Sequence, residues 1–153
     1  MADKLSKLLS TFFYVGYFPF APGTVASAAG LLLYVLLRSN TGAYLLVTAA
    51  ITVLGFVTAG RAERIFNRHD PSEVVIDEVS GILIALFLFP FKFPLAILAF
   101  FIFRGFDAFK APPADSLDKL PGGLGIMLDD IVAALYTNLV FQLAFRFISF
   151  RIS

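Results

Sequence analysis

A long uncharged segment, residues 43–60, most constrains how this chain can fold. Its sequence, AYLLVTAAITVLGFVTAG, is strongly apolar and roughly long enough to cross a bilayer as a helix. The rest of the chain agrees, since 59% of its 153 residues are hydrophobic and only 15% are charged, against about 25% charged in ordinary soluble domains. We therefore expect a membrane protein that forms a single domain over residues 1–153.

Other segments also have helical patterns and predict an all-α fold. Apolar helices are expected over 24–38, from Asp70 to Pro90, from Pro94 to Lys110 and from Gly125 to Phe150. Residues 3–20 form an amphipathic segment that could lie along the membrane surface. The prediction is a compact multi-helix membrane bundle with an amphipathic N-terminal helix and about four to five apolar helices.

The hairpin at residues 76–106 poses a question of length. Each of its apolar arms measures about 12 residues, or roughly 20 Å, whereas the hydrocarbon core is roughly 30 Å thick. Either the acidic residues near the ends of these arms lie inside the membrane boundary, or the hairpin does not fully cross. The first arm opens with the letters DPSE, which favour a helix that begins at Asp70.

Two patterns favour close packing between helices. Ala26 and Gly30 are small residues four apart, a spacing that lets another helix approach closely. In the last helix, residues at intervals of four form a polar or small stripe that we expect to face protein: Asp130, Ala134, Asn138 and Gln142.

The distribution of positive charge predicts which end of the bundle faces the cytoplasm. We place the segments before residue 24, at 61–78 and at 104–130 on one side. The basic residues on that side are Lys4, Lys7, Arg61, Arg64, Arg68, Arg104, Lys110 and Lys119. The opposite side holds only Arg38, Lys92, Arg146 and Arg151. Because cytoplasmic segments are enriched in lysine and arginine, the first side is expected to be cytoplasmic.

Composition excludes several kinds of site. The chain has no cysteine, which excludes disulfides, thiolate metal sites and a cysteine nucleophile. Its one histidine, His69, cannot form a multi-histidine metal site. The formal net charge is +1 and the basic residues are scattered, so no nucleic-acid partner is expected.

Five carboxylates fall on the proposed cytoplasmic side, at the ends of three predicted helices. They are Asp77, Glu78, Asp107, Asp129 and Asp130. Unpaired carboxylates are costly at a membrane boundary, and like charges in a small volume raise one another's pKa. A hard divalent cation would relieve both costs. Among such cations Mg²⁺ matches oxygen ligands best, with Mn²⁺ as a substitute.

Nearby features suit an anionic phosphate group. Arg104 and Lys110 flank Asp107 at spacings of three, so all three could project from nearly one helix face. Arginine can bind phosphate oxygens in a bidentate way, and lysine acts as a point charge. In the turn PGGLG, backbone N–H groups at Gly122 and Gly123 could face an anion at a helix N-terminus, which is a weak signal by itself.

Each feature also has a plainer interpretation. The Arg104–Lys110 group could be ion pairs within one helix, and the adjacent aspartates of the last helix could be favoured by the dipole of a first turn. His69 could be a surface residue beside a helix cap or an auxiliary acid. The basic face at Arg61–Arg68 could be a topology signal, a patch for anionic headgroups or a substrate contact. Convergence of three acidic clusters on one side favours the functional interpretation.

Four blocks of sequence occur in the order found in a known family: PFAPGTVAS at 19–27, VVIDEVSG at 74–81, FRGFDAFKAPP at 103–113 and GGLGIMLDDIVAA at 122–134. On these blocks the chain resembles the phosphatidylglycerophosphatase A family of bacterial membrane lipid phosphatases. The resemblance implies Mg²⁺-dependent removal of the terminal phosphate from phosphatidylglycerophosphate, giving phosphatidylglycerol in phospholipid biosynthesis. It also implies an all-helical, multi-pass protein of the bacterial inner membrane with its site on the cytoplasmic side.

The resemblance carries site residues over by motif. The catalytic carboxylates are Asp77, Glu78, Asp107, Asp129 and Asp130, and all but Asp107 are expected to bind Mg²⁺. Arg104 and Lys110 would stabilise the transferring phosphoryl group. Ala111 stands where the family usually has proline, which loosens the turn without removing a charge. Direct attack by water and a phospho-aspartate intermediate both fit this arrangement.

Other functions remain open at this point. The enzyme could act on other lipid phosphates such as phosphatidic acid, or the protein could be a small membrane transporter or a non-catalytic assembly factor. A transporter usually has ionisable groups near mid-membrane, whereas here the acidic residues cluster at one end. The aspartate-rich pattern of the CDP-alcohol phosphotransferases is absent from the sequence.

Overall fold

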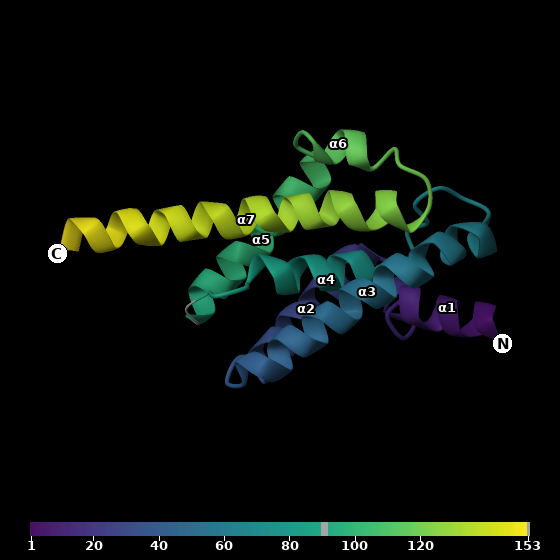
Figure 1. The fold of residues 1–153 in the computed structure, drawn as a ribbon, viewed down its shortest axis with the longest axis horizontal. Helices are drawn as coiled ribbons and strands as arrows, with labels where there is room; N and C mark the ends of the chain where they lie inside the picture. Colours follow the sequence, from purple (N-terminus) through teal and green to yellow (C-terminus); the bar gives the residue numbers. More distant parts are fainter. Residues whose placement is uncertain (90–91, 153) are drawn as a thin grey trace.

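Helix α4 (Ile76–Ala85) lies at the centre of the fold and packs against longer helices (Figure 1). These are α2 (Pro22–Leu37), α3 (Thr41–Phe66), α5 (Phe93–Phe109) and α7 (Gly123–Ile152). Two shorter helices, α1 (Ala2–Ser10) and α6 (Ala114–Leu117), and a 3₁₀ turn, η1 (Val15–Tyr17), complete the set. The computed structural model describes residues 1–89 and 92–152, and this part of the chain is helical without strands, as predicted.

Burial explains the apolar sequence of α4. Val79, Ile82 and Leu83 are fully buried in the main core, which is shared with α2, α5 and α7. The helix ends at Ala85, short of the predicted end at Pro90, and its 10 residues give a length of about 15 Å, half of the hydrocarbon core. The first arm of the predicted hairpin is therefore too short to cross a bilayer and is enclosed by other helices instead.

Small residues let α2 approach α4 closely, as predicted. Ala26 and Gly30 are buried, and a Cβ at Gly30 would lie 2.3 Å from Cγ2 of Ile82. Further along α2, the hydroxyl of Tyr34 donates a hydrogen bond to the carbonyl oxygen of Phe89 at 3.1 Å. Because later residues of α2 contact later residues of the α4 segment, the two helices are parallel. Both begin at the same end of the bundle.

Helix α3 and the 123–146 part of α7 are long and apolar enough to cross a membrane. α3 begins where the side chain of Asn40 accepts a hydrogen bond from the Ala43 N–H at 3.0 Å, and it ends at Asn67 in a left-handed conformation. Several of its large apolar side chains are exposed: Leu45, Leu46, Val53, Leu54 and Val57. These features indicate a membrane-associated protein. The count of four to five apolar helices stays a prediction.

The helix predicted to begin at Asp70 begins instead at Ile76, so that prediction is wrong. Asp70 has a positive φ of 42°, outside the helical region. Segment 70–75 packs against the N-terminal region, where the Val75 N–H donates a hydrogen bond to the carbonyl oxygen of Ser10 at 2.9 Å. Gly16 lies so close that a Cβ there would be 1.9 Å from the Glu73 carbonyl oxygen. These tertiary contacts override the local capping signal.

The stripe along α7 faces protein for most of its predicted length. Asp130 and Ala134 are buried, and the Asn138 amide donates hydrogen bonds to the carbonyl oxygens of Ala85 and Phe87 at 3.0 and 2.8 Å. Gln142 is exposed, so the prediction is wrong for this last residue. The preceding residue, Phe141, is buried in the main core, so α7 still packs against the bundle here and presents Gln142 on its outer face.

Candidate active site

An open cavity of about 290 Å³ collects residues from distant parts of the chain. It lies where the first turns of α2 and α4, the end of α5 and the second turn of α7 meet the 70–74 loop. All predicted site carboxylates and both predicted cations line it: Asp77, Glu78, Arg104, Asp107, Lys110, Asp129 and Asp130. We call it the carboxylate cavity.

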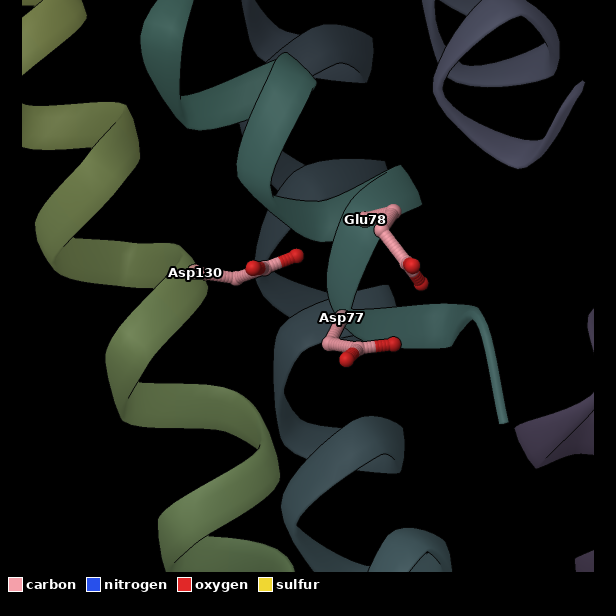
Figure 2. A group of neighbouring side chains, drawn as sticks. All are labelled: Asp77, Glu78 and Asp130. Atoms are coloured by element: carbon pink, nitrogen blue, oxygen red, sulfur yellow. The ribbon is translucent and has the colours of Figure 1, made fainter. Parts of the chain in front are cut away.

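The acidic pair of α4 belongs to the first turn of that helix. Free backbone N–H groups give a helix N-terminus partial positive charge, which favours carboxylates there. Figure 2 shows Asp77 and Glu78 on this turn, with Asp130 reaching toward them from α7. Asp77 is 7% exposed and Asp130 is 2% exposed, so both carboxylates are almost removed from solvent.

This burial changes the acidity of the α4 pair. Burial raises the pKa of Asp77 well above its usual value, and the nearby carboxylates of Glu78 and Asp130 raise it further. Burial also raises the pKa of Glu78, to about 7, although Arg104 opposes the shift. A cation bound to these oxygens would restore the charged forms, since opposite charge lowers the pKa of a carboxyl group.

The carboxylates form two overlapping groups that could each hold a metal ion. The first group consists of Asp77, Glu78 and Asp130, and each residue has a carboxylate oxygen within 4.8 Å of those of the other two. The second group consists of Asp107, Asp129 and Asp130, whose carboxylate oxygens lie equally close together. In the first group, Asp77 Oδ1, Glu78 Oε2 and Asp130 Oδ2 are buried and have no hydrogen-bond partner among the described residues. Such oxygens are unusual in a folded protein and fit a hard cation.

The second group is partly neutralised by the two cations. Arg104 Nη1 lies 2.7 Å from Asp107 Oδ2 and 3.8 Å from Glu78 Oε1. Lys110 Nζ lies 2.9 Å from Asp129 Oδ2 and 2.7 Å from Asp118 Oδ1. The plainer interpretation as a pair within one helix thus holds for Arg104 and Asp107, whereas Lys110 reaches across to α7.

Lys110 ends α5 with a positive φ of 44°, so its side chain leaves the helix face on which the sequence places it with Arg104. Burial acts to lower the pKa of Lys110, but hydrogen bonds to Asp118 and Asp129 outweigh it and raise the pKa. Sequence reasoning did not identify Asp118. No local motif marks it, because its role depends on how the α6–α7 connection folds back.

The glycines of the PGGLG turn lie elsewhere. Gly122 lines a different surface depression, beside Gly60 of α3, and a Cβ at Gly60 would lie 2.8 Å from the Gly123 backbone nitrogen. In this structure the turn brings the start of α7 against α3, and neither glycine lines the carboxylate cavity. Ala21 and Gly23 do line it. Both residues belong to the APGT segment of the first sequence block, but the sequence alone assigned neither residue a role.

His69 and the basic face of α3 lie outside the carboxylate cavity. His69 Nδ1 is 2.7 Å from Glu63 Oε1, and Nε2 is 3.1 Å from the Asp118 carbonyl oxygen. The hydrogen bond to Glu63 raises the pKa of this exposed imidazole. Arg68 pairs with Glu73 at 2.7 Å. These contacts agree with the interpretation of His69 as a surface residue.

Comparisons with known proteins connect this geometry to a family. A sequence model described as Phosphatidylglycerophosphatase A matches residues 8–145. A Haemophilus influenzae protein named phosphatidylglycerophosphatase A is 37% identical, with 87% of this chain and 84% of the relative covered. An Escherichia coli protein of the same name is 33% identical, with 82% and 75% covered.

A third relative has a different name. This Bacteroides thetaiotaomicron protein, provisionally named a phosphatidylinositol-3-phosphatase, is 36% identical, with 92% of this chain and 93% of the relative covered. No solved structure matches the chain significantly. The family match over most of the chain confirms the resemblance seen in the sequence blocks. The chain belongs to the phosphatidylglycerophosphatase A family and is therefore a phosphatase.

Proposed function

We propose that this protein is a Mg²⁺-dependent lipid phosphatase that hydrolyses phosphatidylglycerophosphate to phosphatidylglycerol and inorganic phosphate in bacterial phospholipid biosynthesis. The observation that carries the proposal is the convergence of the five predicted carboxylates and two cations on one cavity, which Asp70 also lines. The family and the names of two relatives support the choice of substrate.

The first carboxylate group fits a magnesium ion best. Asp77, Glu78 and Asp130 offer buried oxygens without hydrogen-bond partners among the described residues, and oxygen ligands are what Mg²⁺ prefers. When bound, Mg²⁺ supplies Lewis-acid polarisation of the phosphate and lowers the pKa of a bound water. Asp129, also predicted as a ligand, accepts hydrogen bonds from Lys110 and from the Asp130 N–H. We assign it mainly to orienting Lys110.

The cations have the complementary task of stabilising negative charge on the transferring phosphoryl group. Arg104 presents a planar guanidinium that can bind two phosphate oxygens at once. Asp107 orients this group through its 2.7 Å contact. Lys110 is held by two carboxylates and acts as a fixed positive charge. Donors that are already in position need little reorganisation as charge develops.

We further propose that the carboxylate cavity faces the cytoplasm in a multi-pass inner-membrane protein, with the N-terminal segment on the membrane surface. Lys7 of α1 lies 5.3 Å from the ring centre of Phe66, at the end of α3, so α1 lies near the cavity end. Exposed apolar side chains gather in this segment: Leu5, Phe13, Tyr14, Tyr17, Phe18 and Phe20. Aromatic and basic residues favour membrane interfaces.

One assay tests the activity and its substrate preference. The purified protein is incubated with phosphatidylglycerophosphate, phosphatidic acid, phosphatidylinositol 3-phosphate and a soluble phosphate ester, each with and without Mg²⁺. We expect rapid phosphate release from phosphatidylglycerophosphate only with Mg²⁺. A stronger preference for the inositol lipid would favour the activity in the name of the Bacteroides relative. No release from any substrate, together with ion flux in liposomes, would favour a transporter.

A further inference from the structure

The first turn of α2 opens into the carboxylate cavity. Ala21, which precedes the helix, has a positive φ of 47°, and Ala21, Pro22 and Gly23 line the cavity wall. No side chain in the described part of the chain makes a capping hydrogen bond to this turn. The Val25 N–H makes the first helical hydrogen bond, to the Ala21 carbonyl oxygen at 3.2 Å. The N–H groups of Gly23 and Thr24 therefore lack acceptors within the helix and form the positive end of its dipole.

Gly23 lies where two site residues meet. A Cβ at this position would be 2.1 Å from Glu78 Oε1 and 3.2 Å from Arg104 Nη2. Any larger residue would displace the Glu78 carboxylate, so glycine allows the end of α2 to approach both groups. The free N–H groups of α2 thus lie beside one residue assigned to the metal and one assigned to the phosphate.

Charge in the cavity indicates why these N–H groups matter. Both cations are already paired, Arg104 with Asp107 and Lys110 with Asp118 and Asp129. A phosphate dianion entering a cavity lined by six carboxylates, Asp70 included, needs further positive potential. The end of a 16-residue helix provides it without a side chain.

A second observation, independent of the helix, indicates that a ligand binds here. Asp77 and Asp130 are more than nine-tenths buried and line the same cavity. Each has an oxygen without a hydrogen-bond partner among the described residues. Such oxygens fit a bound cation, and a cation held there would bring a phosphate group to the same cavity.

We propose that the N-terminus of α2 is the phosphate-binding element of this site, with the N–H groups of Gly23 and Thr24 donating hydrogen bonds to oxygens of a phosphate monoester. The inference rests on the proposed function, because it names the element that holds the substrate in that same cavity. The backbone N–H donors to phosphate are therefore assigned to the APGT segment, residues 21–24. The PGGLG turn, where the sequence predicts them, packs against α3.

Replacement of a single backbone amide by an ester tests the inference. An ester at Thr24 removes its N–H and keeps the side chain. We expect kcat/KM for phosphatidylglycerophosphate to fall about 10- to 100-fold, the effect of losing a hydrogen bond to a charged group. An ester at Ser27 is the matched control, because it removes a helical N–H of α2 away from the cavity. Equal activity in the Thr24 and Ser27 proteins would overturn the inference.

Phosphate binding can also be measured without turnover. Protein labelled with ¹⁵N-glycine is titrated with inorganic phosphate in the presence of Mg²⁺, and the Gly23 signal is identified by its loss in Gly23→Ala. We expect a saturable downfield shift of the Gly23 amide proton, while Gly42 and Gly105 stay unchanged. No Gly23 shift at any phosphate concentration up to the solubility limit of magnesium phosphate would contradict the inference. If the wild type releases no phosphate from lipids, the proposed function fails, and this titration alone decides whether α2 binds phosphate.

Discussion

Lys110 donates a hydrogen bond from Nζ to Asp129 Oδ2 at 2.9 Å and so joins the end of α5 to the second turn of α7. The same ammonium lies 2.7 Å from Asp118 Oδ1. The lysine can make both contacts because the chain turns left-handed at this residue and leaves the helix. The ammonium that we assign to the phosphate site is thereby fixed between two segments that are distant in sequence.

Replacement of this lysine should affect both catalysis and folding. We expect Lys110→Met to lower kcat by about 100-fold or more, since it removes a fixed positive charge from the phosphate site. It should also lower the unfolding temperature, because Asp129 loses its partner while it remains buried. Phosphate release and thermal unfolding measure the two effects. The exposed Lys119→Met is the control, and equal behaviour of the two variants would refute the role of Lys110.

Asp130 is the carboxylate shared by the two groups that could hold a metal ion. We expect Asp130→Asn to abolish Mg²⁺-dependent phosphate release, while the unfolding temperature without Mg²⁺ stays the same or rises. The rise is expected because a buried charge without a partner is removed. Asp115→Asn, at an exposed position in α6, is the control. An active Asp130→Asn protein would exclude this residue from metal binding.

Magnesium should stabilise the folded protein. A ligand that binds only the native state adds about 2.7 kcal/mol at 100 times its Kd, so the wild-type unfolding temperature should rise with Mg²⁺ concentration. The Asp77→Asn/Asp130→Asn double variant should show no rise, because two of three ligands are lost. Thermal unfolding across a Mg²⁺ series, with Ca²⁺ in parallel, provides the measurement. An equal rise in both proteins would place the metal elsewhere.

A methyl group at Gly23 should weaken metal binding through Glu78. The added Cβ would lie 2.1 Å from Glu78 Oε1 and displace this carboxylate. We expect Gly23→Ala to lower Mg²⁺ affinity about 10-fold, as is typical when a ligand loses its support. Calorimetric titration measures this. Gly105→Ala serves as the control because, among the described residues, no neighbouring group lies within 4 Å of a Cβ added there. Unchanged affinity in Gly23→Ala would show that Glu78 is not a ligand.

The His69–Glu63 pair predicts a small pH dependence of stability. The hydrogen bond to Glu63 raises the folded-state pKa of His69 above 6.5. Its contribution is therefore fully present below pH 6.5 and is lost as pH rises through the raised folded-state value. Because the imidazole is 55% exposed, solvent screening limits the effect to about 0.5 kcal/mol.

The comparison that tests this pair uses His69→Gln. This variant should be slightly less stable than the wild type at pH 6 and equal to it at pH 9, as measured by thermal unfolding. Catalytic activity should not change, because His69 does not line the carboxylate cavity. A stability difference that grows with pH would contradict the assignment.

Sequence identified all charged residues of the cavity except Asp70, because charge is costly in so apolar a chain. Asp77, Glu78 and Asp130 stand in segments that otherwise form core, so each needs an explanation beyond solvation. The helices were also predictable, since proline and asparagine mark several helix starts. The bundle geometry could not be predicted in the same way. That α4 is enclosed, and that α7 buries Phe141 and leaves Gln142 exposed, depends on packing.

The roles of the glycines were the hardest feature to predict from the sequence. The same local pattern, glycine at the start of a helix, occurs at Gly23 and at Gly122. Only the three-dimensional arrangement distinguishes them, because Gly23 lies against Glu78 and Arg104 whereas Gly122 lies near Gly60. Asp70 illustrates the same limit, since a strong local helix signal yields to contacts made by the N-terminal segment.

The brevity of α4 constrains the biogenesis of this protein. A half-length helix that carries Asp77 and Glu78 cannot be released into lipid as an independent unit, so it must wait for neighbours. One of those neighbours, α7, is synthesised after α4 and brings Asp130. A chain that stops before α7 would therefore leave Asp77 and Glu78 without Asp130, and the core face of α4 without one of its covering helices.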